Sequence, residues 1–278
     1  MREIALTAWA PYALAASQDG PVWMTVLSPA GLARLSRDGT EVTLRELPAK
    51  PMLLAIGAGG TVWHTSQDDR IGRDGESWFP LPDGAAPYGI AAAQDGGVFF
   101  SAPGIDRIGH ITASGEITMV PASGYAAMVA VSDDGAAWVA LNAGGKLARW
   151  DRASLDIVDI PPGRTAAAPV GLAAAGHGGR VWYADIAGGS VGLADAGGLI
   201  SRVEFDDPGC RPHAVMASPD GGCWATLWGS GQLARVSADG SVTLTDLPGQ
   251  EPHGLTLVGD EVWVAMESGS VVQVPISG

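Results

Sequence analysis

The stretch PYALAASQDGPVWMT, residues 11–25, returns along the chain in similar form, and this repetition decides the fold. Each copy has a proline, a run of small and apolar residues, a polar turn, and an aromatic residue with apolar neighbours. The seven copies begin at Pro11, Pro51, Pro87, Ala127, Pro169, Pro212 and Pro252, and Ala126 takes the place of proline in the fourth. Seven repeats with a period of roughly 40 residues predict a seven-bladed β-propeller, an all-β fold.

Two further strands are predicted in each repeat, which makes four per blade. After the aromatic residue comes a short apolar segment such as LARL (residues 32–35) or RIGH (residues 107–110). A fourth segment then ends near a proline, as in TLRELP (residues 43–48) and ITMVP (residues 117–121). Short strands separated by Gly and Asp turns are typical of antiparallel hairpins. Each blade is therefore predicted to be a four-stranded antiparallel sheet.

The two ends of the chain complete the ring in this interpretation. The last repeat supplies three strands, and residues 2–6 supply the fourth, so that the N-terminal strand pairs into the last blade and covers an exposed edge. A single propeller domain over residues 1–278 follows. The aromatic residues that repeat in register are predicted to pack between blades; they are Trp23, Trp63, Phe99, Trp138, Trp182, Trp224 and Trp263.

Charge and hydropathy exclude two classes of partner, nucleic acid and membrane. The 278 residues include 30 acidic and 16 basic ones, a formal net charge of −14, so the chain would repel a phosphate backbone. No apolar run reaches the roughly 20 residues that span a bilayer. Residues 4–16 are similar to the apolar part of a signal peptide, but they fit the repeat register and contain Pro11. We expect a soluble, cytoplasmic monomer.

Three histidines and both cysteines are assigned structural or surface positions. His64 follows an aromatic residue in the second repeat, His110 lies in a predicted third strand, and His177 lies in a turn at the far mouth of the channel. Cys210 and Cys223 form no metal-binding pattern and are expected to be buried, reduced thiols.

Residues that follow the proline of each repeat should meet at one mouth of the central channel, because the innermost strand of every blade begins there. Around the ring they are Tyr12, Met52, Tyr88, Ala127, Val170, His213 and His253. The two histidines on neighbouring blades form a candidate site. Glu251 precedes His253 by two residues, which puts both side chains on one side of an extended segment. Glu267 follows the second strand of the same blade and should therefore return to this mouth.

The two glutamates allow two interpretations. Carboxylate oxygens are preferred ligands of Mg²⁺, an ion that keeps several waters and needs few protein ligands. Solvated acids in loops explain the same residues equally well. Spacing alone leaves both interpretations open.

Three segments resemble the virginiamycin B lyases, also called streptogramin B lyases. They are RPH at residues 211–213, EPHG at residues 251–254 and WVAME at residues 263–267, within a repeat pattern that is similar over nearly the whole chain. Members of that family open the lactone ring of type B streptogramin antibiotics by elimination and require Mg²⁺. The resemblance implies a carbon–oxygen lyase that confers antibiotic resistance.

Position by position, the resemblance implies a role for each candidate residue. His253 would be the general base, and Glu251 and Glu267 would bind Mg²⁺. His213 would contact the substrate, a cyclic depsipeptide. Tyr12 would border the same site.

Two other classes of function compete with this interpretation. A lactonase-type hydrolase built on a propeller would also hold a divalent ion at the channel mouth. A non-catalytic propeller would bind a ligand there without a metal. The sixth repeat also departs from the family, which commonly has an acid in WFTEWG where this chain has Leu227 in WATLWG. That difference bears on which substrate fits.

Overall fold

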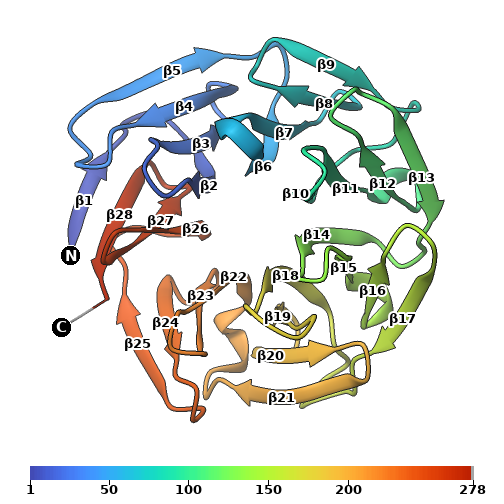
Figure 1. Cartoon of the computed structure of the whole chain (residues 1–278). Coiled ribbons are helices and arrows are strands. Elements are labelled where there is room, and N and C mark those ends of the chain that lie inside the picture. Colours follow the sequence, from blue (N-terminus) through green and yellow to red (C-terminus); the bar gives the residue numbers. More distant parts are fainter. Residues whose placement is uncertain (277–278) are drawn as a thin grey trace.

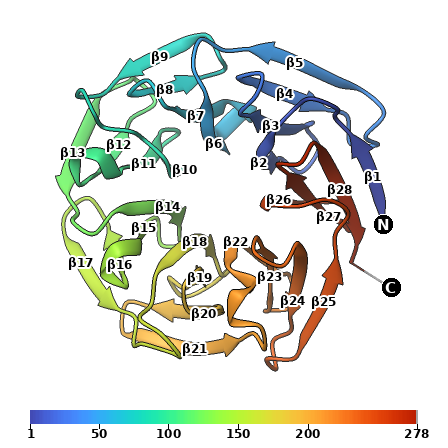
Figure 2. The same ribbon diagram turned by 180° about the vertical axis from the view of Figure 1, so that it is seen from behind.

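The computed structural model describes residues 1–276 and consists of seven sheets arranged in a ring (Figure 1). Every sheet has four strands, and consecutive strands pair antiparallel, so the predicted seven-bladed β-propeller is confirmed. The innermost strands surround the centre of the ring in the views from both sides (Figures 1 and 2). Residues 277–278 of the predicted domain lie outside the described residues.

The blades follow one another in chain order. Blade 1 contains β2 (Pro11–Ala16), β3 (Val22–Val26), β4 (Gly31–Leu35) and β5 (Val42–Glu46). Blade 2 contains β6 (Pro51–Ile56), β7 (Val62–Ser66), β8 (Arg70–Arg73) and β9 (Ser77–Pro80). Blade 3 contains β10 (Ile90–Ala92), β11 (Val98–Ala102), β12 (Arg107–Ile111) and β13 (Ile117–Pro121). Blade 4 contains β14 (Ala126–Val131), β15 (Ala137–Leu141), β16 (Lys146–Trp150) and β17 (Leu155–Asp159).

The second half of the chain builds the last three blades. Blade 5 contains β18 (Pro169–Ala174), β19 (Val181–Asp185), β20 (Ser190–Asp195) and β21 (Gly198–Glu204). Blade 6 contains β22 (Pro212–Ala217), β23 (Cys223–Leu227), β24 (Gln232–Val236) and β25 (Val242–Asp246). Blade 7 contains β26 (Pro252–Val258), β27 (Glu261–Met266), β28 (Ser270–Pro275) and β1 (Arg2–Ala5).

In the described part of the chain, residues 1–276, helical structure is confined to four single turns. These 3₁₀ turns are η1 (Ala58–Gly60), η2 (Pro103–Ile105), η3 (Asn142–Gly144) and η4 (Pro208–Cys210). Within residues 1–276, no helix has the length and hydropathy of a membrane-spanning segment.

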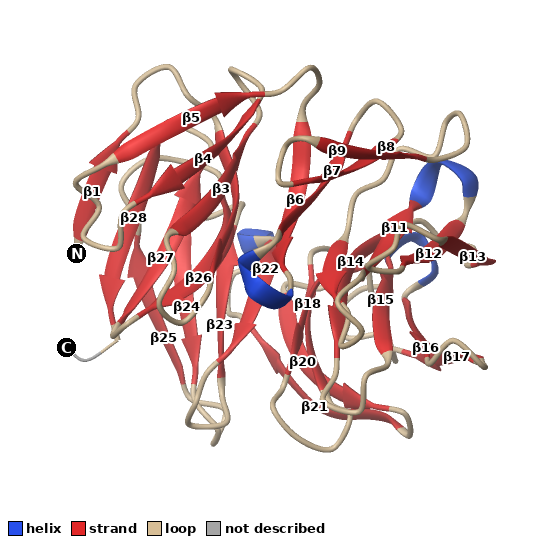
Figure 3. Cartoon of the chain, turned by 45° about the horizontal axis from the view of Figure 1, so that its top comes forward, coloured by secondary structure: helices blue, strands red, loops and turns tan. Residues whose placement is uncertain are grey.

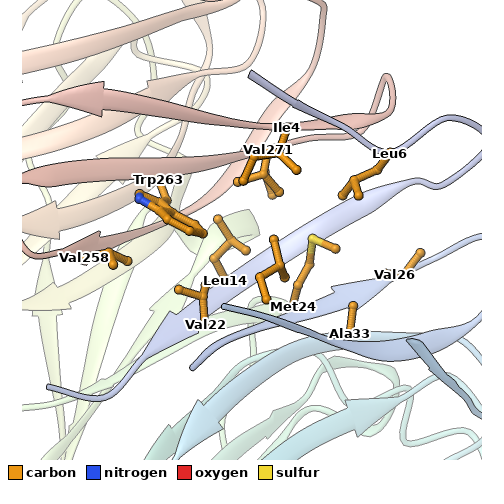
Figure 4. Close-up of a cluster of buried hydrophobic side chains, with 12 residues drawn as sticks. Ile4, Leu6, Leu14, Val22, Met24, Val26, Ala33, Val258, Trp263 and Val271 are labelled. Carbon is orange, nitrogen blue, oxygen red and sulfur yellow. The ribbon is translucent and has the colours of Figure 1, made fainter. Parts of the chain in front are cut away.

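The ring closes through β1, which pairs with β28 as predicted, with Ile4 opposite Val271. The two strands also lie side by side in the tilted view (Figure 3). The strand ends at Ala5, one residue before the predicted end. Figure 4 shows the apolar cluster at this seam, which joins blade 1 to blade 7; its members include Ile4, Leu6, Leu14, Val22, Met24, Val258, Trp263 and Val271.

The aromatic residues that repeat in register form the core between blades, as predicted, with one partial exception. Trp63, Phe99, Trp138, Trp182, Trp224 and Trp263 are all buried. Trp23 is only half-buried, and it lines an outer groove between blades 1 and 2 together with Val62 and Leu44.

A β-bulge at the start of the innermost strand shapes the channel mouth in six blades. In blade 6, Pro212 pairs with Leu227 and Val215 pairs with Ala225, so His213 and its successor face a single residue of β23. A bulge leaves the extra residue out of the ladder and changes the direction of its side chain. The bulges therefore fall at the residues that follow the prolines.

Candidate active site

The two histidines predicted at the channel mouth lie against each other. His213 is the second residue of β22, and His253 is the second residue of β26 in the next blade. Their ring centroids are 4.7 Å apart, with an interplanar angle of 85°. Each residue is only 7% exposed. The structure thus brings together two imidazoles that are forty residues apart in the sequence.

Glu267 completes a hydrogen-bonded pair with His253. It directly follows β27, and its Oε2 lies 2.6 Å from the Nε2 of His253. A carboxylate only accepts hydrogen bonds, so a neutral His253 must carry its proton on Nε2. The Nδ1 atom of His253 is buried and has no hydrogen-bond partner within residues 1–276. This ring nitrogen therefore has a free lone pair.

Burial keeps both imidazoles neutral at physiological pH. Loss of hydration lowers the pKa of His253 to about 4. Burial, with a smaller contribution from the neighbouring His253, lowers the pKa of His213 to about 3. Both rings therefore have a free lone pair at physiological pH, although the lowered pKa makes each a weaker base than a solvated imidazole.

Tyr12 contacts the histidine pair from blade 1, and Tyr88 of blade 3 contacts Tyr12 in turn. The ring centroid of Tyr12, in β2, lies 4.4 Å from that of His253, so the prediction that Tyr12 borders the site is confirmed. Its hydroxyl is 2.8 Å from the hydroxyl of Tyr88, which precedes β10. Burial raises the pKa of Tyr12 to about 12, so its hydroxyl stays protonated. The sequence places Tyr88 at the channel mouth as an aromatic residue after a proline. It does not predict the hydrogen bond to Tyr12, because that partner lies two blades away.

A cavity of about 620 Å³ opens at blade 6, between the segments that precede β22 and β26, and includes Glu251 in its wall. Trp228 also lines it, and the ring centroid of this residue is 6.5 Å from that of His253. The guanidinium of Arg211 lies over the Trp228 ring at 5.0 Å. Trp228 follows β23 just as Glu267 follows β27, so the repeat register could have identified it as a mouth residue.

The predicted extended conformation of the segment from Glu251 to His253 is wrong. The backbone φ of Glu251 is 57°, which is left-handed, so the segment before His253 is not extended. The Glu251 carbonyl accepts a hydrogen bond from the Glu267 N–H at 3.1 Å, and the Glu251 side chain is exposed. The two glutamates are neighbours through their backbones, while only Glu267 contacts His253 by its side chain.

The carboxylates at the channel mouth determine which kind of metal ion could bind there. Within residues 1–276, no group of three or more His, Cys, Asp and Glu side chains is arranged to hold one. Two exposed or half-exposed carboxylates at one mouth suit Mg²⁺, which binds through one or two carboxylates and retains water. A closed cage of protein ligands is not present, and Mg²⁺ binding stays a prediction.

The remaining histidines and cysteines lie where they were expected. His64 is fully buried, His110 is buried and lies 3.1 Å from Asp95, and His177 is exposed in the turn between β18 and β19. Cys210 and Cys223 are free and buried.

Leu227, which replaces the acid of the related motif, is 1% exposed. It packs in an apolar cluster between blades 5 and 6 with residues such as Phe205 and Val215. Its side chain therefore belongs to the core and leaves His213, His253, Glu251 and Glu267 undisturbed.

The fold and the site together define a β-propeller with a buried histidine pair and a hydrogen-bonded carboxylate at one mouth of its channel. The model of the "Virginiamycin B lyase family" matches residues 1–274. The chain belongs to the virginiamycin B lyase family.

Individual relatives are similar over almost the full length. The chain is 35% identical to a virginiamycin B lyase of Nocardia farcinica, covering 95% of each sequence. A crystal structure of the virginiamycin B lyase from Staphylococcus aureus superposes with a TM-score of 0.91 at 28% identity, covering 98% of this chain and 97% of the other. A catalytically inactive histidine-to-alanine variant of the S. aureus enzyme with quinupristin gives a TM-score of 0.90 at 28% identity, covering 97% of each chain.

Proposed function

We propose that this protein is a Mg²⁺-dependent lyase that linearises type B streptogramins by eliminative opening of their lactone ester, and that it thereby confers antibiotic resistance. Membership of the virginiamycin B lyase family and the related structure with quinupristin support the substrate class. The observation that carries the proposal is the 2.6 Å contact of His253 with Glu267, beside His213. A monomer located in the cytoplasm is part of the same proposal.

The reaction begins with removal of a proton from carbon. In the substrate, the ester joins the side-chain oxygen of a threonine to a terminal carboxyl carbon. His253 takes the proton from the threonine Cα, and the C–H electron pair becomes a Cα=Cβ double bond. The Cβ–O bond breaks, and its electrons leave with the carboxylate. The product is a linear peptide with the same mass as the substrate.

His253 suits the role of general base in three respects. It is neutral at physiological pH because burial lowers its pKa. Glu267 orients the ring and holds the proton on Nε2, which leaves Nδ1 as the accepting atom. The adjacent carboxylate also stabilises the imidazolium that forms on proton transfer. General-base catalysis is typically worth about 10²- to 10⁴-fold in rate.

Glu251 and Glu267 are the proposed Mg²⁺ ligands. His253 uses one oxygen of Glu267, and the other oxygen stays available to the ion. When bound, Mg²⁺ supplies positive charge that polarises a substrate carbonyl.

Substrate binding is assigned to His213 and to the cavity at blade 6. His213 is a neutral imidazole beside the base, so it offers a hydrogen bond to the depsipeptide. The cavity presents the Trp228 ring to apolar groups of the antibiotic and the Arg211 guanidinium to its carbonyl oxygens.

The decisive experiment is incubation with quinupristin, with and without EDTA, followed by mass spectrometry. We expect a linear product of unchanged mass, formed only without EDTA. A product heavier by one water would indicate the lactonase-type hydrolase. Absence of any product would indicate a binding propeller and contradict the proposal.

Substitution of the base gives a second test. His253→Ala should lower turnover of quinupristin by about 10²- to 10⁴-fold while the protein stays folded. His177→Ala is the matched control, because His177 is exposed at a turn of blade 5. Turnover and circular dichroism of both variants check this, and a folded His253→Ala with full turnover would exclude His253 as the base.

A further inference from the structure

A buried hydroxyl in blade 6 bonds to the backbones of two blades. Thr226, in β23, is fully buried. Its Oγ1 accepts a hydrogen bond from the Ala214 N–H at 3.0 Å and donates one to the His253 carbonyl at 2.8 Å. Ala214 directly follows His213. One hydroxyl therefore joins the segments that carry both histidines of the site.

The β-bulges explain why these two backbone groups need a partner. In blade 6 the bulge places His213 and Ala214 opposite Thr226. In blade 7 the register likewise shifts between Pro252 and Leu255, so His253 has no partner in its own ladder. Buried backbone groups that lose their ladder partner require another one. Thr226 serves one such group from each blade.

Other blades contain the same bridge, and they show what is particular to Thr226. The equivalent hydroxyls donate to carbonyls of the next blade: Thr25 to Met52, Thr65 to Tyr88 and Ser101 to Ala127. Blades 4, 5 and 7 have alanine at this position, namely Ala140, Ala184 and Ala265. The fold therefore does not need the hydroxyl in every blade, and only the bridge of blade 6 ends at the proposed base.

We propose that Thr226 is a positioning residue, whose hydroxyl holds the backbone of His253 in register with that of His213. This inference rests on the proposed function. Without the bridge, the backbone of His253 loses its hydrogen bond to blade 6 and only ring contacts remain across the blades, so the ring moves relative to His213 and Glu267. A displacement of about 1 Å in a catalytic group lowers rates by up to about 10²-fold. Substrate affinity depends on this bridge less than kcat does, because the cavity with Trp228 and Arg211 offers binding contacts besides His213.

The test compares three variants with quinupristin as substrate. Thr226→Val removes the hydroxyl and keeps the shape, and we expect kcat to fall about 10- to 100-fold with KM changed by less than about threefold. Thr226→Ser keeps the hydroxyl and should restore at least half of the wild-type kcat. Ser101→Ala is the matched control, because it removes a buried bridge that ends at Ala127, and its kcat should stay within about twofold of wild type.

An independent measurement reports on geometry without turnover. The ring resonances of His213 and His253 in NMR spectra, recorded at one fixed pH, should shift in Thr226→Val and not in Ser101→Ala. If wild type does not act on quinupristin, the proposed function fails, and these spectra still test the positioning role. If Thr226→Val does not fold, Thr226→Ala replaces it, since alanine stands at this position in blades 4, 5 and 7.

Three results would overturn the inference. The first is a folded Thr226→Val with wild-type kcat and unshifted histidine resonances. The second is an equal loss of kcat in Thr226→Val and Ser101→Ala. The third is failure of Thr226→Ser to restore turnover.

Discussion

His213 and His253 differ from the other histidines of the chain by the neighbours that the ring supplies. Each is buried against the other, and His253 also meets a carboxylate. His110 has a comparable partner in Asp95, but that pair lies in the third strand of blade 3, away from the channel mouth. A histidine becomes a candidate base here because burial, an orienting acid and access to the channel coincide.

Glu251, a proposed Mg²⁺ ligand, has an unfavourable backbone conformation. Its left-handed φ of 57° costs a non-glycine residue roughly 1–2 kcal/mol. We expect Glu251→Gly to raise the free energy of unfolding by about 0.5–1 kcal/mol, because the greater freedom of an unfolded glycine offsets part of the gain. The same variant should lower Mg²⁺-dependent turnover, since it removes a proposed ligand.

Urea denaturation and a turnover assay measure the two effects of that variant separately. Glu41→Gly is the control, because Glu41 is exposed and its backbone is not left-handed. This control should lose stability and keep its turnover. A loss of stability in Glu251→Gly would show that the left-handed conformation is not a cost in this protein.

In blades 2, 3 and 5, an aromatic or imidazole ring of the second strand lies opposite a glycine of the third strand. Phe100 lies opposite Gly109, and a Cβ added to Gly109 would be 2.2 Å from the Phe100 ring. Tyr183 lies opposite Gly192 in the same way in blade 5. His64 occupies this position in blade 2, above Gly72. Neither ring nitrogen of His64 has a hydrogen-bond partner within residues 1–276, so this ring takes the place of an apolar aromatic ring.

This substitution of a histidine for an aromatic ring predicts a pH-dependent stability. Burial lowers the pKa of His64 to about 4, below the value near 6.5 of the unfolded chain. The unfolded state therefore binds a proton first as the pH falls, and stability is lost between about pH 6.5 and 4. The loss reaches about 3 kcal/mol, at 1.36 kcal/mol per pKa unit.

His64→Phe should remove this contribution, because Phe100 over Gly109 shows that the site geometry accepts phenylalanine. Urea denaturation of wild type and variant at pH 7.5 and pH 4.5 would measure how much the free energy of unfolding of each protein changes with pH. The other buried histidines contribute equally to both proteins. Parallel stability curves would mean that His64 is not kept neutral by burial.

At the scale of the whole molecule, stability depends on closing the ring at one seam. β1 is the only strand of blade 7 that comes from the N-terminus, and Ile4 and Leu6 are each at most 9% exposed in the seam cluster. Burial of an aliphatic side chain of this size is worth about 1.5–3 kcal/mol. Loss of these contacts would also uncover the edge of β28, and exposed strand edges promote aggregation.

We expect Ile4→Ala to lower the free energy of unfolding by about 2–4 kcal/mol and to promote aggregation on heating. Glu3→Ala is the matched control, because the neighbouring Glu3 is exposed, and its effect should stay within about 0.5 kcal/mol. Thermal unfolding followed by light scattering measures both. Equal melting temperatures of the two variants would show that the seam contributes little to stability.

The sequence by itself determined the architecture, because a period of roughly 40 residues repeats the same strand and turn chemistry seven times. From the start of each repeat it also placed Tyr12, His213 and His253 at one mouth, and the second strand returned Glu267 there. These placements follow from the repeat period, which can be read from a single sequence.

Only the tertiary structure decided which of these groups touch. The Tyr12–Tyr88 hydroxyl pair and the Thr226 bridge each join different blades, and no spacing along the chain encodes a contact across the ring. The left-handed backbone conformation of Glu251 is likewise known only from the structure, because glutamate is not a residue type that favours positive φ. Local patterns set the strands, whereas bulges and closure of the ring set the distances on which the chemistry depends.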